Sequence, residues 1–117
     1  MLVYWVTSWR KPMSLLQKID LVELQGAAGE ACKLLKVLSN PDRLLLLCQM
    51  TQGEFSVSEL EAITGIGQPT LSQQLTVLRE EHVVSSRRNG KQIFYTITSA
   101  EAMTVLQVLY QLYCPAR

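Results

Sequence analysis

Apolar residues recur at intervals of three and four between about residues 15 and 38, which is the spacing of an amphipathic helix. The segment Ser39-Asn40-Pro41 ends this pattern, because Asn40 can cap a new helix and Pro41 fits its first turn. The residues that follow, 43–50, are apolar on nearly all sides. They predict a second helix at the centre of the hydrophobic core.

Two shorter helices around a tight turn are predicted at residues 56–64 and 69–78. Ser56 and Glu59 have the spacing of a capping box, and Gly65-Ile66-Gly67 supplies the turn. In the second helix an apolar stripe opposes a polar one, Leu71, Leu75 and Leu78 against Pro69, Ser72, Gln73 and Thr76. We therefore expect the apolar stripe to pack on the core and the polar face to remain free.

A β-hairpin is predicted next, from two β-prone runs at residues 83–88 and 92–97. Asn89-Gly90 lies between the runs and predicts a type I′ turn, because these residue types accept the positive φ that both central positions require. Residues 54 and 55, earlier in the chain, can pair as a short strand. The hairpin carries three cations, Arg87, Arg88 and Lys91.

The last predicted helix begins after Ser99, which can cap it, and ends at Pro115. Its polar residues form one narrow stripe and its apolar residues cover the rest of its surface. One small core cannot hide that much apolar surface. We therefore expect a homodimer in which this helix, beside the first one, packs against its copy.

In this order the elements predict a mainly α fold with a small β-hairpin wing, that is, a winged helix-turn-helix. The length of 117 residues fits one such domain at residues 15–117, behind an N-terminal tail at residues 1–14. The tail is apolar and aromatic but lacks the features of a signal peptide. We expect a disordered tail or a misplaced start codon; an arm that packs on a partner is the alternative.

The free polar face of the helix at residues 69–78 indicates a DNA reader. We expect Gln68, Thr70, Ser72 and Gln73 in the major groove, with Gln73 best suited to adenine. Arg87, Arg88 and Lys91 would contact phosphates or the minor groove. Two other interpretations stay open: in the first these side chains are merely solvated, and in the second the domain binds protein, although the cationic hairpin argues against the second.

Composition narrows the class of protein. The net charge is +1, so local placement of cations and not a general basic field must support DNA binding. No apolar run approaches the roughly 20 residues that cross a bilayer.

Three cysteines without a secretion signal indicate free thiols in a reducing cytoplasm. The chain has no Cys-x-x-Cys pair and no Gly-rich cofactor loop, so we expect neither an enzyme nor a cofactor.

Three motifs carry a family resemblance. Residues 35–44, 71–75 and 91–95 read LKVLSNPDRL, LSQQL and KQIFY. In this order and spacing they resemble the ArsR/SmtB family of bacterial winged-helix repressors, over about residues 27–114. The resemblance implies a homodimer with the first and last helices at the interface, the third and fourth helices on operator DNA, and the hairpin as a wing.

The metal sites of that family are not matched. Val57-Ser58-Glu59-Leu60 stands where arsenite and cadmium sensors carry a Cys-x-Cys pair. Zinc sensors carry Asp and His ligands on the last helix, whereas the single histidine here, His82, lies at the other end of the domain and reads as a turn residue. We therefore expect no metal site of either kind.

Cys48 and Cys114 are similar to the cysteine pair of the persulfide-responsive BigR/SqrR-like subgroup, to which HlyU is related. The resemblance implies that reactive sulfur species or an oxidant bridge the two thiols and release the repressor from its operator. A disulfide requires Cα atoms roughly 4.4 to 6.8 Å apart, and a polysulfide slightly more. The negative end of the helix dipole disfavours a thiolate at Cys114, so we expect Cys48 to attack first.

Other roles for the cysteines stay open. From its neighbours alone, Cys48 can be a small core residue, and Cys32 is expected to serve packing. Cys32, Cys48 and Cys114 could instead form a thiol ligand set for arsenite or another soft metal. A HlyU-like regulator with a different inducer is a further alternative.

Overall fold

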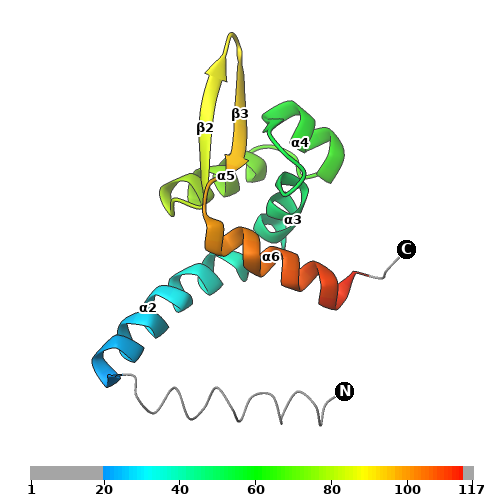
Figure 1. The fold of residues 1–117 in the computed structure, drawn as a ribbon. Coiled ribbons are helices and arrows are strands. Elements are labelled where there is room, and N and C mark those ends of the chain that lie inside the picture. Colours follow the sequence, from blue (N-terminus) through cyan, green and yellow to red (C-terminus); the bar gives the residue numbers. More distant parts are fainter. Residues whose placement is uncertain (1–19, 115–117) are drawn as a thin grey trace. The chain divides into compact units, whose positions relative to one another are not determined.

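The computed structural model describes residues 20–114. The elements are, in order, α2 (Leu21–Leu38), α3 (Pro41–Met50), β1 (Phe55–Ser56), α4 (Val57–Thr64), α5 (Thr70–Glu80), β2 (Val84–Asn89), β3 (Gln92–Ile97) and α6 (Ala100–Tyr113) (Figure 1). This order confirms the predicted winged helix-turn-helix. The chain divides within α2 into two compact units, Met1–Lys33 and Leu34–Arg117. The predicted helix start near residue 15 and the whole of the predicted tail, residues 1–14, lie outside the described residues, in which α2 begins at Leu21.

Local capping fixes where α3 and α4 begin. The Asn40 side-chain oxygen accepts hydrogen bonds from the backbone nitrogens of Asp42 at 2.9 Å and Arg43 at 3.1 Å, which confirms its capping role. At α4 the predicted capping box is present. The Glu59 nitrogen donates to Ser56 Oγ at 3.1 Å, and the Ser56 nitrogen donates to Glu59 Oε1 at 2.8 Å.

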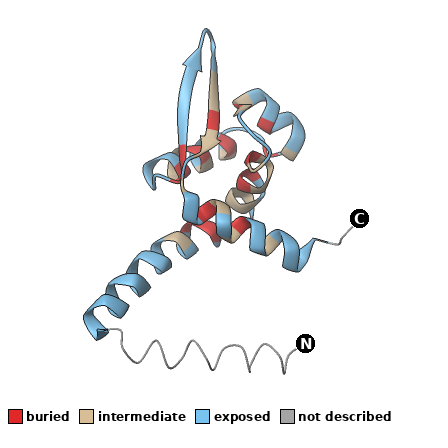
Figure 2. Ribbon diagram, in the orientation of Figure 1, coloured by how far each residue is buried: buried red, intermediate tan, exposed pale blue. Residues whose placement is uncertain are grey.

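The core of the Leu34–Arg117 unit gathers where α3, α4, α5 and α6 meet the base of the hairpin (Figure 2). The largest fully buried side chains are Leu46, Leu47, Met50, Leu60, Leu71, Leu75, Leu78 and Leu106. All three leucines of the predicted α5 stripe are among them, and so are three residues of α3. The predicted packing side of α5 and the central place of α3 are therefore confirmed.

The sheet has three antiparallel strands in the order β1-β3-β2. The predicted short strand exists, but it comprises Phe55 and Ser56, one residue later than expected, and it pairs with β3. The predicted type I′ turn centred on Asn89-Gly90 is wrong. Asn89 pairs with Gln92, so the two loop residues are Gly90 and Lys91, and of these only Gly90, at φ 65°, has positive φ. That pattern is typical of a type II′ turn.

Apolar side chains remain uncovered on α6. Only Ala102 and Leu106 of this helix are buried, whereas Val108, Tyr110, Leu112 and Tyr113 are exposed. In the Met1–Lys33 unit, the start of α2 exposes Leu21, Val22 and Leu24. The predicted excess of apolar surface on the last helix is therefore present in the single chain. None of the helices at residues 20–114 has the length and apolar character to cross a membrane.

Candidate DNA-binding surface and thiol pair

The polar face of α5 is exposed and partly organised by its own side chains. Gln68, Ser72 and Gln73 are exposed, and Thr70 is half-buried. Gln68 Oε1 accepts hydrogen bonds from the Ser72 nitrogen at 3.2 Å and from Ser72 Oγ at 2.7 Å. The Gln68 amide nitrogen is left to donate outward, whereas Gln73 makes no side-chain hydrogen bond to another described residue. Gln73 therefore keeps both its donor and its acceptor for a base edge.

Arg43 anchors α5 from its inner side. The guanidinium donates to Gln74 Oε1 at 3.0 Å, to the Val37 carbonyl at 2.7 Å and to the Lys36 carbonyl at 3.2 Å. It thus ties α5 to the end of α2 while satisfying carbonyls that a helix terminus leaves free. Sequence reasoning missed this role, because Arg43 and Gln74 lie 31 positions apart and appeared only as members of two motifs.

His82 joins α5 to the wing, as predicted for a turn residue. It has a φ of 61°, and it is the one non-glycine residue with positive φ among residues 20–114. The His82 nitrogen donates to the Arg79 carbonyl at 3.0 Å, and the Val83 nitrogen donates to the Leu78 carbonyl at 3.0 Å. This pair of hydrogen bonds is a Schellman motif, which ends α5 and turns the chain into β2.

The three cations of the wing do not share one environment. Arg87 donates from Nε to Glu54 Oε2 at 2.8 Å and from Nη2 to Glu54 Oε1 at 2.7 Å, and its Cζ lies 4.9 Å from the centre of the Phe94 ring. The hydrogen bonds from Arg87 lower the pKa of the Glu54 carboxyl. Arg88 and Lys91 are exposed and make no ion pair with another described residue.

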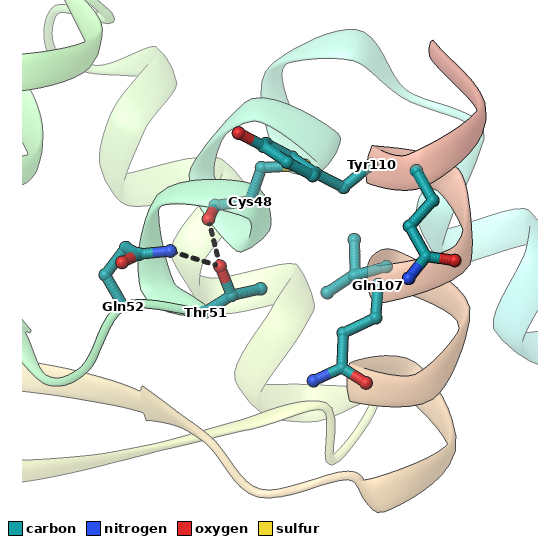
Figure 3. A pocket seen from close by; sticks show the side chains of 7 residues that line it. Cys48, Thr51, Gln52, Gln107 and Tyr110 are labelled. Carbon is teal, nitrogen blue, oxygen red and sulfur yellow. Dashed lines mark hydrogen bonds between the residues drawn. The ribbon is translucent and has the colours of Figure 1, made fainter. Parts of the chain in front are cut away.

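Cys48 lies on α3 beside an open pocket of about 440 Å³ between α3 and α6. The pocket is lined by Cys48, Thr51, Gln52, Leu106, Gln107, Tyr110 and Gln111. Figure 3 shows Tyr110 extending from α6 toward Cys48, while Thr51 Oγ1 donates to the Cys48 carbonyl at 2.6 Å. The Cys48 side chain is half-buried and packs against the core, yet it also reaches this opening.

Cys114 follows Tyr110 by one helical turn. The Cys114 nitrogen donates to the Tyr110 carbonyl at 2.9 Å, so the two residues lie on the same side of the end of α6. The Cys114 side chain is exposed, and both Cys114 and Cys48 are free thiols. Burial raises the pKa of Cys48, and the negative charge of Cys114 raises it further. The charge of Cys114 is therefore sensed at Cys48, although Cys114 itself does not line the α3–α6 pocket.

This environment argues against the expected order of attack. A half-buried thiol with a raised pKa carries less thiolate at neutral pH, and thiolate is the reacting form. Cys114 is the more accessible of the two thiols. The expectation that Cys48 attacks first considered only the helix dipole at Cys114. It did not include the burial of Cys48 on α3, which raises the pKa of that thiol.

The other candidate ligands are dispersed. Within residues 20–114, no three His, Cys, Asp or Glu side chains are grouped closely enough to hold a metal ion. Cys32 is exposed on α2, in the Met1–Lys33 unit, and is not a packing residue there. Its expected role in packing is therefore not seen in the single chain.

Comparison with known proteins decides the family. A model described as "Bacterial regulatory protein, arsR family" matches residues 40–86. A biofilm growth-associated repressor of Xylella fastidiosa is 54% identical over 92 residues, which cover 79% of this chain and 81% of that protein. The chain belongs to the ArsR family. The family resemblance carried by the three sequence motifs is thus confirmed.

Within the ArsR family the similarity extends to the subgroup predicted from the sequence. The crystal structure of the repressor BigR from Xylella fastidiosa is 51% identical, with a TM-score of 0.77, and the match covers 84% of this chain and 100% of that one. The transcriptional activator HlyU of Vibrio cholerae is 36% identical over 98 residues, or 84% of this chain and 91% of HlyU. This chain is a DNA-binding transcriptional repressor of the BigR type, and it is not an enzyme.

Proposed function

We propose that this ArsR-family repressor binds operator DNA as a homodimer and is released when Cys48 and Cys114 are bridged by reactive sulfur species or an oxidant. One observation carries the proposal: Cys48 of α3 lines a pocket shared with Tyr110 of α6, and the charge of Cys114, one turn after Tyr110, acts on the Cys48 thiol by raising its pKa. The similarity to BigR supports the class of protein. A regulator of this kind acts in a reducing cytoplasm, where its resting thiols stay free.

The bridging chemistry follows from thiol exchange. The thiolate of the exposed Cys114 attacks the outer sulfur of a persulfide donor, the donor's S–S bond breaks, and the donor leaves as a thiol after taking up a proton. Cys114 then carries the extra sulfur. Cys48 attacks the inner sulfur, a disulfide forms and hydrogen sulfide leaves. Two thiols are oxidised and one sulfur atom is reduced to sulfide. If both cysteines first take up a sulfur, their condensation gives a trisulfide and one hydrogen sulfide.

Release of DNA requires that the bridge alter the placement of the two α5 helices. A bridge ties α6 to α3, and α6 presents exposed apolar residues that a second copy would cover. Two reading helices must match major grooves about 34 Å apart. A hundredfold loss of operator affinity corresponds to about 2.7 kcal/mol, which lies in the usual range of roughly 1 to 3 kcal/mol for allosteric coupling.

On DNA, we place the polar face of α5 in the major groove, with Gln73 as the main base reader beside Gln68, Thr70 and Ser72. The wing contributes Arg88 and Lys91, which are exposed without an ion-pair partner among residues 20–114. Arg87 is ion-paired with Glu54 in the structure, and the proposed contact between the wing and DNA does not require it.

A gel shift on the DNA upstream of the gene tests the proposal. The reduced wild-type protein and the reduced Cys48→Ser and Cys114→Ser variants are each expected to retard the DNA. Treatment with an organic persulfide should weaken wild-type binding about a hundredfold, in line with the coupling above, and should leave both serine variants bound.

Cys32→Ser is the matched control, because Cys32 is an exposed thiol in the other unit of the chain. It is expected to respond to persulfide as the wild type does. Equal binding by treated and untreated wild type, or release of the Cys48→Ser variant, would contradict the proposed switch.

A further inference from the structure

Arg87 is held against one face of the wing by Glu54 and Phe94. Two hydrogen bonds of 2.8 and 2.7 Å join its guanidinium to both carboxylate oxygens of Glu54, and the Phe94 ring lies beneath it. Paired hydrogen bonds together with stacking fix both the position and the plane of a guanidinium. Phosphate binds arginine through the same fork of donors. The carboxylate of Glu54 therefore occupies the site on Arg87 that a DNA phosphate would use.

The sheet register separates Arg87 from its neighbour Arg88. Arg87 stands opposite Phe94 in the β2–β3 ladder, and successive side chains of a strand point to opposite faces. Arg88 therefore lies on the other face, which it shares with the buried residues Val84 and Tyr95. The two arginines are adjacent in the sequence but are presented to different surroundings.

The pairing also changes the charge that the wing can offer. The whole chain has a net charge of only +1, so each local cation matters for phosphate binding. With Arg87 neutralised by Glu54, Arg88 and Lys91 are the wing cations without an ion pair among the described residues. The Arg87 side chain is still 54% exposed. It would be reachable by a phosphate if the carboxylate were removed.

We propose that Glu54 masks Arg87 from DNA phosphates and thereby limits the sequence-independent affinity of the wing for DNA. Glu54 acts through Arg87 and is a positioning residue that makes no DNA contact of its own. A repressor selects its operator by the ratio of specific to non-specific affinity, so a masked cation improves selectivity. The inference rests on the proposed DNA surface and is independent of the thiol switch.

A simpler role for the pair makes a different prediction. If Glu54 and Arg87 only brace the sheet, their removal changes the thermal stability of the protein but not the number of phosphates that it contacts. The salt dependence of DNA binding separates the two roles, because its slope counts neutralised phosphates.

The test measures binding of the reduced full chain to a non-operator DNA duplex by fluorescence anisotropy, between about 50 and 200 mM salt. Glu54→Gln is expected to bind the duplex more tightly than the wild type. Its plot of log affinity against log salt concentration should be steeper by about 0.9 for each bound chain, because the freed Arg87 neutralises one more phosphate. Arg87→Ala alone is expected to keep the wild-type slope. The double variant should return to that slope, because the cation that Glu54→Gln releases is gone.

Glu61→Gln is the matched control, since Glu61 is an exposed acid on α4 whose side chain has no hydrogen bond to another described residue. It removes the same charge and should keep the wild-type slope. A shallower slope for Arg87→Ala alone, or an unchanged slope for Glu54→Gln, would overturn the proposal. If a thermal melt shows that Glu54→Gln is not folded, the slope of Arg87→Ala alone tests the proposal. Failure of the wild type to bind the duplex at all would instead count against the proposed DNA surface.

Discussion

Cys48 combines two roles that usually exclude each other. It packs against the core from α3, and it also borders the pocket toward α6. Burial raises its pKa and the charge of Cys114 adds to that effect, so Cys48 is mainly a thiol at neutral pH. Such a residue resists general oxidants and reacts well once a partner sulfur lies beside it. This combination suits the second step of a bridging reaction.

Replacing Cys114 tests the electrostatic contact at this scale. In Cys114→Ser, the pH at which alkylation of Cys48 reaches half its maximal rate should fall, because a neighbouring negative charge is lost. This midpoint pH should stay above the midpoint of an ordinary exposed thiol, because Cys48 remains half-buried. Peptide mass spectrometry after timed alkylation measures the rate at Cys48 separately. Cys32→Ser serves as the control, and an unchanged midpoint would show that the two thiols do not sense each other.

Residue roles set by near neighbours in the sequence were predictable, and those set by the tertiary fold were not. The caps at Asn40 and Ser56 depend on residues two or three positions away, and the structure has both. The pairing of Arg87 with Glu54 spans 33 positions and exists only because β1 and β2 both join β3. The two thiols were matched through the family resemblance, since no local pattern links α3 to the end of α6.

At the scale of elements, the two strands of the wing were predicted correctly, but the type of turn between them was not. Asn-Gly favours a type I′ turn, but β2 extends through Asn89 and pairs it with Gln92. The register of the whole ladder, with Val84 and Tyr95 buried on one face, fixes where the loop falls. Local turn preference is weaker than that constraint.

α6 is the element that links the thiols to the proposed dimer. Leu112 is 67% exposed on this helix, and Leu112→Glu should place a charge in the proposed interface. We expect a mainly monomeric protein by analytical ultracentrifugation and at least tenfold weaker operator binding, because one chain reads only one half-site. Thr104→Glu adds the same charge at an exposed polar position of α6 and should remain dimeric. If the Leu112→Glu variant remains dimeric, the dimer interface does not include this part of α6.

At the scale of the whole molecule, physical contacts join the reading helix α5, the wing and the helices that carry the thiols. Arg43 fixes α5 to the end of α2, the Schellman motif at His82 joins α5 to the wing, and Cys48 lines the pocket between α3 and α6. A covalent link between α3 and α6 acts on a core that is packed from both helices. Because packed cores do not deform continuously, such a link favours one arrangement of the reading helices over another.

The most direct test follows bridge formation and DNA release in one sample. Wild-type protein on fluorescent operator DNA is titrated with an organic persulfide, and each aliquot is read by anisotropy and then mapped by mass spectrometry of its non-reduced peptides. The account predicts that peptides containing Cys48 and Cys114 become linked, by two or more sulfur atoms, in step with loss of bound DNA. Release while the two cysteines carry separate modifications, or linkage without release, would contradict it.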